Sequence, residues 1–323
     1  MNNFKKVGLS ALAGSLAMMS AHAGDFTVTG GAELTYTSKS TQVTGNPLGL
    51  SQNIKFTGTG EVNGIAYTVY SDTAGQDFGS DSAYVKFDFG DMGTLAFEQG
   101  ADSSGIGSLA NNTPTAYEEA DHQSGALGDG LDRAGDTGVI AYNNTISDFG
   151  VSIEFNPAPG GTGYSQAGAS GGNNSAGSNI NYALKYSIGS VALAMGQSMT
   201  EKAGSTPDDD EFTVSANYTM GAVEVGAQRS SIEMGASTAA DYEVTAYAIA
   251  FNVNDQLSVS YGISDNTKDN PSVADVTEEN QGIMAAYSMG SAAFRISMNS
   301  TDNVNGVAGT DREVTEVSLN LSF

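Results

Sequence analysis

Apolar and polar residues alternate along this chain of 323 residues, and no long apolar run follows residue 23. The pattern is clearest at the C-terminus, where Val317–Phe323 reads Val-Ser-Leu-Asn-Leu-Ser-Phe. Successive side chains of a β-strand point to opposite faces, so the four apolar residues of this segment share one face. A lipid bilayer requires that all backbone N–H and C=O groups are paired within the protein, which leaves helices and closed barrels as spanning structures. The C-terminal segment therefore predicts the closing strand of a barrel whose apolar face meets lipid.

The N-terminus has the features of a signal peptide. A pair of lysines precedes Val7–Met19, a short stretch of mostly small and apolar residues, and Ala21–Ala23 fits a small-x-small cleavage site. The apolar stretch is too short for a spanning helix. We expect residues 1–23 to be a signal peptide that is removed on export, and residues 24–323 to form one transmembrane β-barrel domain.

Charge and residue usage exclude several classes of function. Without the leader lysines Lys5 and Lys6, ten basic and 37 acidic residues remain, so the formal charge is −27. Such a charge repels nucleic acid and attracts cations. Cysteine is absent, and His122 is the one histidine that follows the signal peptide. This inventory offers little for catalysis, and we expect neither a cofactor nor enzymatic activity.

Turn signals divide the mature chain into sixteen candidate strands. The strands cover residues 26–36, 50–61, 65–71, 83–89, 95–99, 137–143, 151–156, 180–188, 191–199, 212–220, 223–231, 242–253, 257–264, 281–289, 293–300 and 313–323. Short turns alternate with longer polar connections at 38–49, 72–82, 100–136, 157–179, 200–211, 232–241, 265–280 and 301–312. An even number of strands and alternating connection lengths are typical of outer-membrane barrels, with short periplasmic turns and long external loops. The predicted fold class is an all-β, transmembrane, antiparallel β-barrel of about 16 strands.

Three segments resemble one known family. They are the opening Gly24–Tyr36, the hairpin Phe87–Phe97 and the closing Val317–Phe323. In their order and in the terminal phenylalanine, the chain looks like a Gram-negative porin of the general-diffusion type, closest to those of alphaproteobacteria, over the whole mature sequence. The resemblance implies a sixteen-stranded barrel in the bacterial outer membrane, in contact with lipid and lipopolysaccharide. It also implies a homotrimer and a third external loop that folds into the pore.

The chain departs from that family at one place that bears on selectivity. Porins of this type often carry a Gly-Arg pair after the hairpin strand, and the arginine lines the constriction. Here Phe97–Gly100 reads Phe-Glu-Gln-Gly, so no arginine occupies that place. This departure favours cations.

The third external loop, residues 100–136, is the predicted constriction loop. Its charge is concentrated at Glu118, Glu119, Asp121, Asp129, Asp132, Arg133 and Asp136. Folded inward, such carboxylates narrow the lumen and favour the passage of cations. The alternative is an acidic, solvated surface loop without a role in transport.

Strand parity predicts which basic side chains line the pore wall. Apolar neighbours point outward at each site, so the intervening charge points inward, where it costs less than in lipid. The predicted wall residues are Lys55, Lys86, Lys185 and Arg295, together with Glu98. Acids across the lumen would then create a transverse field. Alternatively, these basic groups only offset the many acids. Arg229 shares the parity of outward residues, so we expect it beyond the lipid zone or past a β-bulge.

The remaining candidates are weaker. Asp208, Asp209 and Asp210 form an acidic run that can bind a divalent cation or remain a solvated loop, and we predict no dedicated metal site. The predicted function is a water-filled channel for passive diffusion of small hydrophilic solutes and ions, with a preference for cations. The alternatives are a secreted or surface-attached β-rich structural protein or adhesin, and a barrel enzyme. No catalytic sequence motif supports the last of these.

Overall fold

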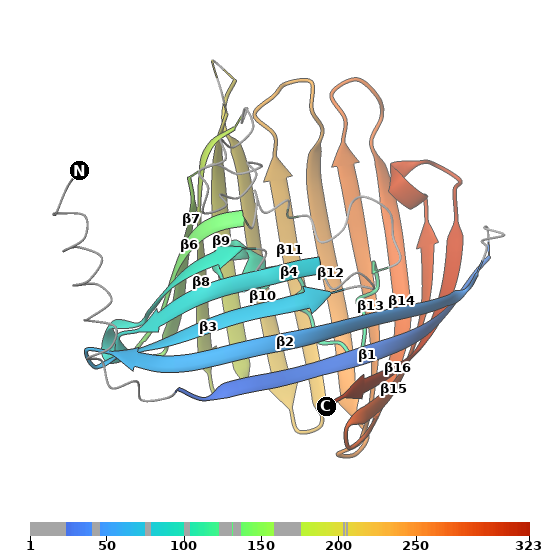
Figure 1. Cartoon of the computed structure of the whole chain (residues 1–323). Helices are drawn as coiled ribbons and strands as arrows, with labels where there is room; N and C mark the ends of the chain where they lie inside the picture. The colour runs from blue at the N-terminus through green and yellow to red at the C-terminus, as the bar shows by residue number, and fades with distance from the viewer. Residues whose placement is uncertain are drawn as a thin grey trace.

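Sixteen antiparallel strands close into one barrel (Figure 1). The computed structural model describes residues 24–40, 46–74, 79–99, 104–122, 131, 137–157, 176–202, 204 and 206–323. The strands are β1 (Phe26–Lys39), β2 (Leu48–Val62), β3 (Ile65–Ala74), β4 (Gly79–Asp88), β5 (Thr94–Gln99), β6 (Thr137–Ile146), β7 (Phe149–Asn156), β8 (Ala176–Ile188), β9 (Val191–Lys202), β10 (Asp209–Met220), β11 (Val223–Glu233), β12 (Asp241–Asn252), β13 (Leu257–Asp269), β14 (Val276–Met289), β15 (Ala292–Asp302) and β16 (Arg312–Ser322). Each strand pairs with its neighbours in sequence, so the predicted fold class is confirmed.

Helical structure is minor in the described part of the chain. It consists of three 3-10 segments, η1 (Gly90–Met92), η2 (Gly105–Leu109) and η3 (Val304–Gly306). Within the described residues, no helix has the length and apolar character needed to cross a membrane.

The last strand closes the barrel on the first. β16 pairs with β1 from Gly31↔Ser322 to Lys39↔Val314. Two backbone hydrogen bonds extend the ladder, because the Gly30 and Phe323 N–H groups each donate to the other residue's carbonyl at 3.1 and 3.0 Å. The predicted closing strand is therefore confirmed, and the cylinder has no open edge to leave unpaired in lipid.

The strands are longer than predicted at the rim of the long loops. β13 continues to Asp269 and β14 begins at Val276, five residues beyond each predicted boundary. The connection between β3 and β4, predicted as 72–82, shrinks to 75–78. The ladder continues here because paired backbone groups do not require apolar side chains once a strand has left the lipid zone. The alternation of connection lengths is accordingly weaker at this loop.

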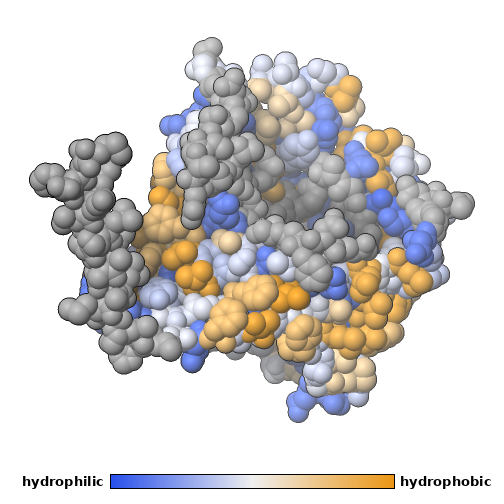
Figure 2. All heavy atoms as spheres, in the orientation of Figure 1, coloured by the Kyte–Doolittle hydropathy of each residue, from blue (hydrophilic) through white to orange (hydrophobic). Residues whose placement is uncertain are grey.

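The barrel has an apolar outer face and a polar inner face. On β12 the outward side chains Tyr247, Ile249 and Phe251 are 53%, 44% and 41% exposed, and alanines occupy the alternate inward positions. Figure 2 shows hydrophobic side chains gathered on the outside of the wall that faces the viewer. Inward positions elsewhere carry buried polar groups, among them Asn181 and Gln228. This division is typical of a transmembrane barrel.

Two adjacent positions on β12 test the assignment of faces. We expect Ile249→Arg to destabilise the barrel by about 2–4 kcal/mol, because it places a charge in the apolar outer band. Ala250→Arg should cost much less, since Ala250 points inward and is the register partner of Glu224 on β11. Denaturant unfolding of both variants in lipid vesicles measures the difference. Equal destabilisation would contradict the assignment.

The outer face carries an ion pair between β11 and β12. Arg229 on β11 and Glu243 on β12 approach to 2.6 Å, and their side chains are 61% and 48% exposed. β11 pairs with β10 and β12 without a register shift at Arg229. The alternative of a β-bulge at this residue is therefore wrong, and the carboxylate of Glu243 compensates the outward arginine.

Candidate functional site

A segment of the third external loop lies inside the barrel. We call residues 104–122 the internal segment. Its first part is attached to β7 and β8, where the Gly105 N–H donates to Ser152 Oγ at 2.7 Å and the Ile106 N–H donates to Asn181 Oδ1 at 2.9 Å. Ile106 and Leu109 are almost fully buried. These contacts place the start of the segment against the inner wall.

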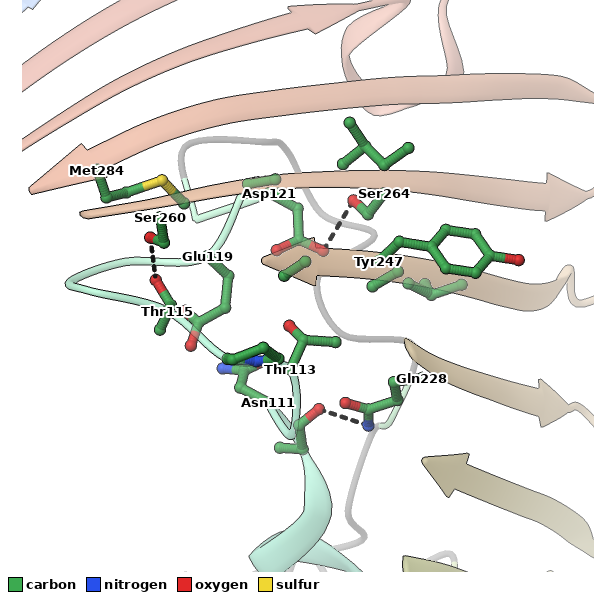
Figure 3. A pocket seen from close by; sticks show the side chains of 18 of the residues that line it. Asn111, Thr113, Thr115, Glu119, Asp121, Gln228, Tyr247, Ser260, Ser264 and Met284 are labelled. Atoms are coloured by element: carbon green, nitrogen blue, oxygen red, sulfur yellow. Dashed lines mark hydrogen bonds between the residues drawn. The ribbon is translucent and has the colours of Figure 1, made fainter. Parts of the chain in front are cut away.

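The middle of the internal segment is held by β10 and β11. The Gln228 amide donates to the carbonyls of Leu109 and Ala110 at 2.7 and 2.8 Å and accepts from the Asn112 N–H at 2.7 Å. Asn217 donates to the Asn112 carbonyl at 2.9 Å. Figure 3 shows Gln228 pointing from its strand toward this part of the segment. The internal segment is irregular, so its backbone groups lack the partners that a helix or a sheet would supply. The side-chain amides of Gln228 and Asn217 supply those hydrogen bonds instead.

The last part of the internal segment is held by β13 and β15. The Ala116 N–H donates to Ser260 Oγ at 2.9 Å. Ser264 Oγ donates to Asp121 at 3.1 Å (Figure 3). Asn299 on β15 donates to the carbonyls of Glu119 and Ala120 at 3.0 and 2.8 Å. A cavity of about 30 Å³ remains between segment and wall. This exceeds the roughly 10–15 Å³ that one water requires.

Tyr117 attaches the internal segment to the seam between the first and last strands. Its hydroxyl lies 2.9 Å from Glu316 Oε1 on β16 and 3.3 Å from Glu33 Oε1 on β1. The Arg295 guanidinium lies 5.3 Å from the centre of the Tyr117 ring and 3.9 Å from Glu33. Burial and the hydrogen bond to Glu316 raise the pKa of Tyr117, so the phenol stays protonated and can donate.

Inward-facing glycines make room for the internal segment. A Cβ at Gly196 on β9 would lie 2.9 Å from Ile106 Cγ1 and 3.1 Å from Leu109 Cδ1. A Cβ at Gly282 on β14 would lie 3.3 Å from Ala120 Cα. The wall therefore fits the segment by shape as well as by hydrogen bonds.

The acidic groups of the internal segment form one turn. His122 Nδ1 lies 2.9 Å from Glu118 Oε2. Burial, reinforced by the charges of Glu118 and Asp121, raises the pKa of Glu119. The hydrogen bond with Glu118 raises the pKa of His122, against the opposing effect of burial. The turn thus brings three acidic side chains, Glu118, Glu119 and Asp121, together on a segment that lies within the lumen.

The predicted wall residues fall into two groups. Lys55 on β2 and Lys86 on β4 are partly exposed, and among the described residues neither strand hydrogen-bonds to the internal segment. Lys185 donates to the Ser108 carbonyl at 3.2 Å, so it lies against the segment, as Arg295 does at Tyr117. Glu98 is 4% exposed and accepts from Ser104 Oγ at 3.3 Å. Of the predicted basic wall residues, Lys55 and Lys86 are thus the two that do not lie against the described part of the internal segment.

Some predicted residues lie elsewhere or outside the described residues. Asp129, Asp132, Arg133 and Asp136 are outside the described residues. Asp208 accepts from the Lys202 N–H at 3.1 Å, Asp209 pairs with the Lys202 side chain and accepts from the Gly235 N–H at 2.9 Å, and Asp210 is exposed. Asp208 and Asp209 of the acidic run thus stabilise the connections around β10 through hydrogen bonds and an ion pair.

Comparisons with known proteins agree on the fold. No family model matches the sequence, and no curated protein matches it at the sequence level. Among solved structures, the chain is similar to OmpT, an outer membrane protein of Vibrio cholerae (TM-score 0.69, 12% identity, 94% of this chain and 99% of that chain). OmpT also matches in a trimer form, with a TM-score of 0.64 at 14% identity over 93% of this chain and 100% of that one. Similar too are an anion-selective porin from Comamonas acidovorans (TM-score 0.68, 14% identity) and a mutant of the Rh. blastica porin (TM-score 0.62, 17% identity), each over 93% of this chain and all of the other. The chain therefore has the fold of the outer-membrane porins, as the sequence resemblance predicted.

Sequence reasoning missed the residues that fix the internal segment. Tyr117, Gln228 and Asn299 each make two or more contacts between the internal segment and the barrel wall. The sequence did contain a signal for them: glycine or a side-chain amide occupies inward positions on many of the strands. A wall that only faces water does not require these residue types, whereas a wall that packs against a segment does.

Proposed function

We propose that this protein is an outer-membrane porin, a water-filled channel for passive diffusion of small hydrophilic solutes and ions with a preference for cations. The observation that carries the proposal is the internal segment, which brings Glu118, Glu119 and Asp121 into the lumen of a closed barrel. Porins of the same fold include an anion-selective one, so selectivity follows from the charges of the lumen and not from the fold.

The mechanism requires no energy source and no catalytic group. Water fills the lumen beside the internal segment, and a solute passes if it fits the narrowest section. Carboxylates on the segment attract cations, while Lys55 and Lys86 on the other side orient dipolar solutes. The local field is strong because low-dielectric barrel walls focus it.

The apolar outer face opposes the alternative of a secreted adhesin. A soluble protein rarely leaves a large contiguous apolar patch exposed, whereas this barrel exposes Phe26, Val28, Leu34 and Tyr36 along β1 alone. Export by a cleaved signal peptide, insertion among outer-membrane lipid and lipopolysaccharide, and assembly into a homotrimer complete the proposal. The trimer form of OmpT supports the last point.

Reversal potentials in planar bilayers test the proposal. In a salt gradient we expect discrete conductance steps and a reversal potential of cation-selective sign. Combined E118Q, E119Q and D121N substitutions should move the reversal potential toward zero, because they remove three carboxylates from the lumen and keep their size. The matched control neutralises three acids of external connections, Asp208, Asp275 and Asp311, and should change selectivity less. Anion preference in the unaltered channel would overturn the proposal that the carboxylates of the internal segment make the channel cation-selective.

A further inference from the structure

One turn of the internal segment brings together three side chains of metal-binding type. Ligand atoms of Glu118, Glu119 and His122 all lie within 4.8 Å of one another. In the described part of the chain this is the one group of at least three Asp, Glu, His or Cys side chains that meets this criterion. The imidazole distinguishes it from a purely acidic cluster, since a nitrogen ligand favours transition metals over Ca²⁺ and Mg²⁺.

Groups outside the cluster fix the backbone from which these ligands project. Asn299 on β15 holds the carbonyls of Glu119 and Ala120, and the Thr115 hydroxyl donates to the Glu118 carbonyl at 2.6 Å. Ala120 lies buried over Gly282 of the wall. The barrel thus holds the backbone of Glu119, and the segment itself holds that of Glu118, which lowers the ordering cost of binding an ion.

We infer that Glu118, Glu119 and His122 bind a divalent transition metal of the Zn²⁺ class, and that the bound ion regulates the channel. Imidazole nitrogen and carboxylate oxygen are both ligands that Zn²⁺ accepts, and three protein ligands with water in the fourth position is the pattern of open zinc sites. A bound dication offsets two carboxylates of the segment and occupies space beside it. Binding should therefore lower cation selectivity and conductance together. The regulatory part of this inference rests on the proposed channel function.

Metal titration of the mature, untagged protein tests the site without reference to transport. His122 is the one imidazole of residues 24–323, so a chain without a histidine tag carries no competing histidine. Calorimetric titration in detergent should show one Zn²⁺ per chain. H122Q should weaken binding by more than the roughly 10–100-fold that loss of an outer-shell partner costs. Zn²⁺ binding that H122Q leaves unchanged would overturn the site, as would no binding at all.

Conductance in the presence of the metal tests the regulation. Zn²⁺ added to the unaltered channel should reduce conductance and move the reversal potential toward zero, and a chelator should reverse both effects. Mg²⁺ should do much less, because it keeps its waters and prefers oxygen ligands. H122Q channels, compared with their own metal-free state, should lose the response. Absence of channels in metal-free buffer would refute the proposed function and leave the titration intact, whereas open channels that ignore Zn²⁺ would refute the regulation alone.

Discussion

Replacement of residues 100–136 by a short Asn-Gly turn should raise single-channel conductance severalfold and abolish most of the cation selectivity. Gln99 and Thr137, which flank the replaced loop, are register partners on β5 and β6, directly after a register shift at Glu98, so a tight turn can join them. The change removes the whole internal segment and its carboxylates from the lumen. Conductance depends on the cross-section of the narrowest part of the channel. Removal of the internal segment should therefore change conductance more than any point substitution. Single-channel recording in planar bilayers measures the effect.

A matched loop replacement controls for indirect effects on the barrel. Asn156 and Asn179 are likewise register partners, on β7 and β8, and the same short turn can replace residues 157–178 between them, which include the first three residues of β8. This variant should retain the conductance and the selectivity of the unaltered channel. If both replacements raised conductance equally, or if removal of 100–136 left it unchanged, the internal segment would not be the constriction.

The strand order was predictable because each strand can be recognised from the alternation of apolar and polar residues in its own sequence. Alternation over about ten residues identifies a strand, and lipid forbids any edge to stay open, so closure of β16 on β1 follows from the count of strands. Strand ends were less predictable. Beyond the lipid zone both faces of a strand are polar, as in Glu278 and Glu279 on β14, and the alternation that marked the strand is lost.

The path of the internal segment was not predictable from alternation. Its contacts join residues far apart in sequence, such as Tyr117 with Glu316 and Glu119 with Asn299. Each partner looks locally like an ordinary lumen residue, because parity states that a side chain points inward but not what it meets there. Arg295 illustrates the limit: parity puts it on the inner face, but its contact is the ring of Tyr117 on the segment that it was expected to oppose.

Removal of residues 312–323 should abolish the folded barrel. β16 forms nine register pairs with β1 and ten with β15, so its loss leaves two strand edges unpaired along their length. Each backbone group left unpaired in lipid costs several kcal/mol, and a few such groups exceed the roughly 5–15 kcal/mol by which a native domain is stable. We expect no protease-resistant barrel and no channels after refolding into lipid vesicles. Circular dichroism and bilayer recording measure both losses.

A deletion of the same length outside the strands serves as the control, because it affects no hydrogen-bonded strand pair. Residues 161–172 lie in the connection between β7 and β8, and their deletion leaves every strand in place. That variant should fold and conduct, because loop length has little influence on stability compared with edge pairing. Restoring closure is the stricter test: β16 supplied as a separate peptide should recover protease resistance if pairing with β1 and β15 is what was lost. A truncated chain that formed stable channels without the peptide would show that the barrel does not need its last strand. The prediction that the alternating C-terminal segment closes the barrel would then be wrong.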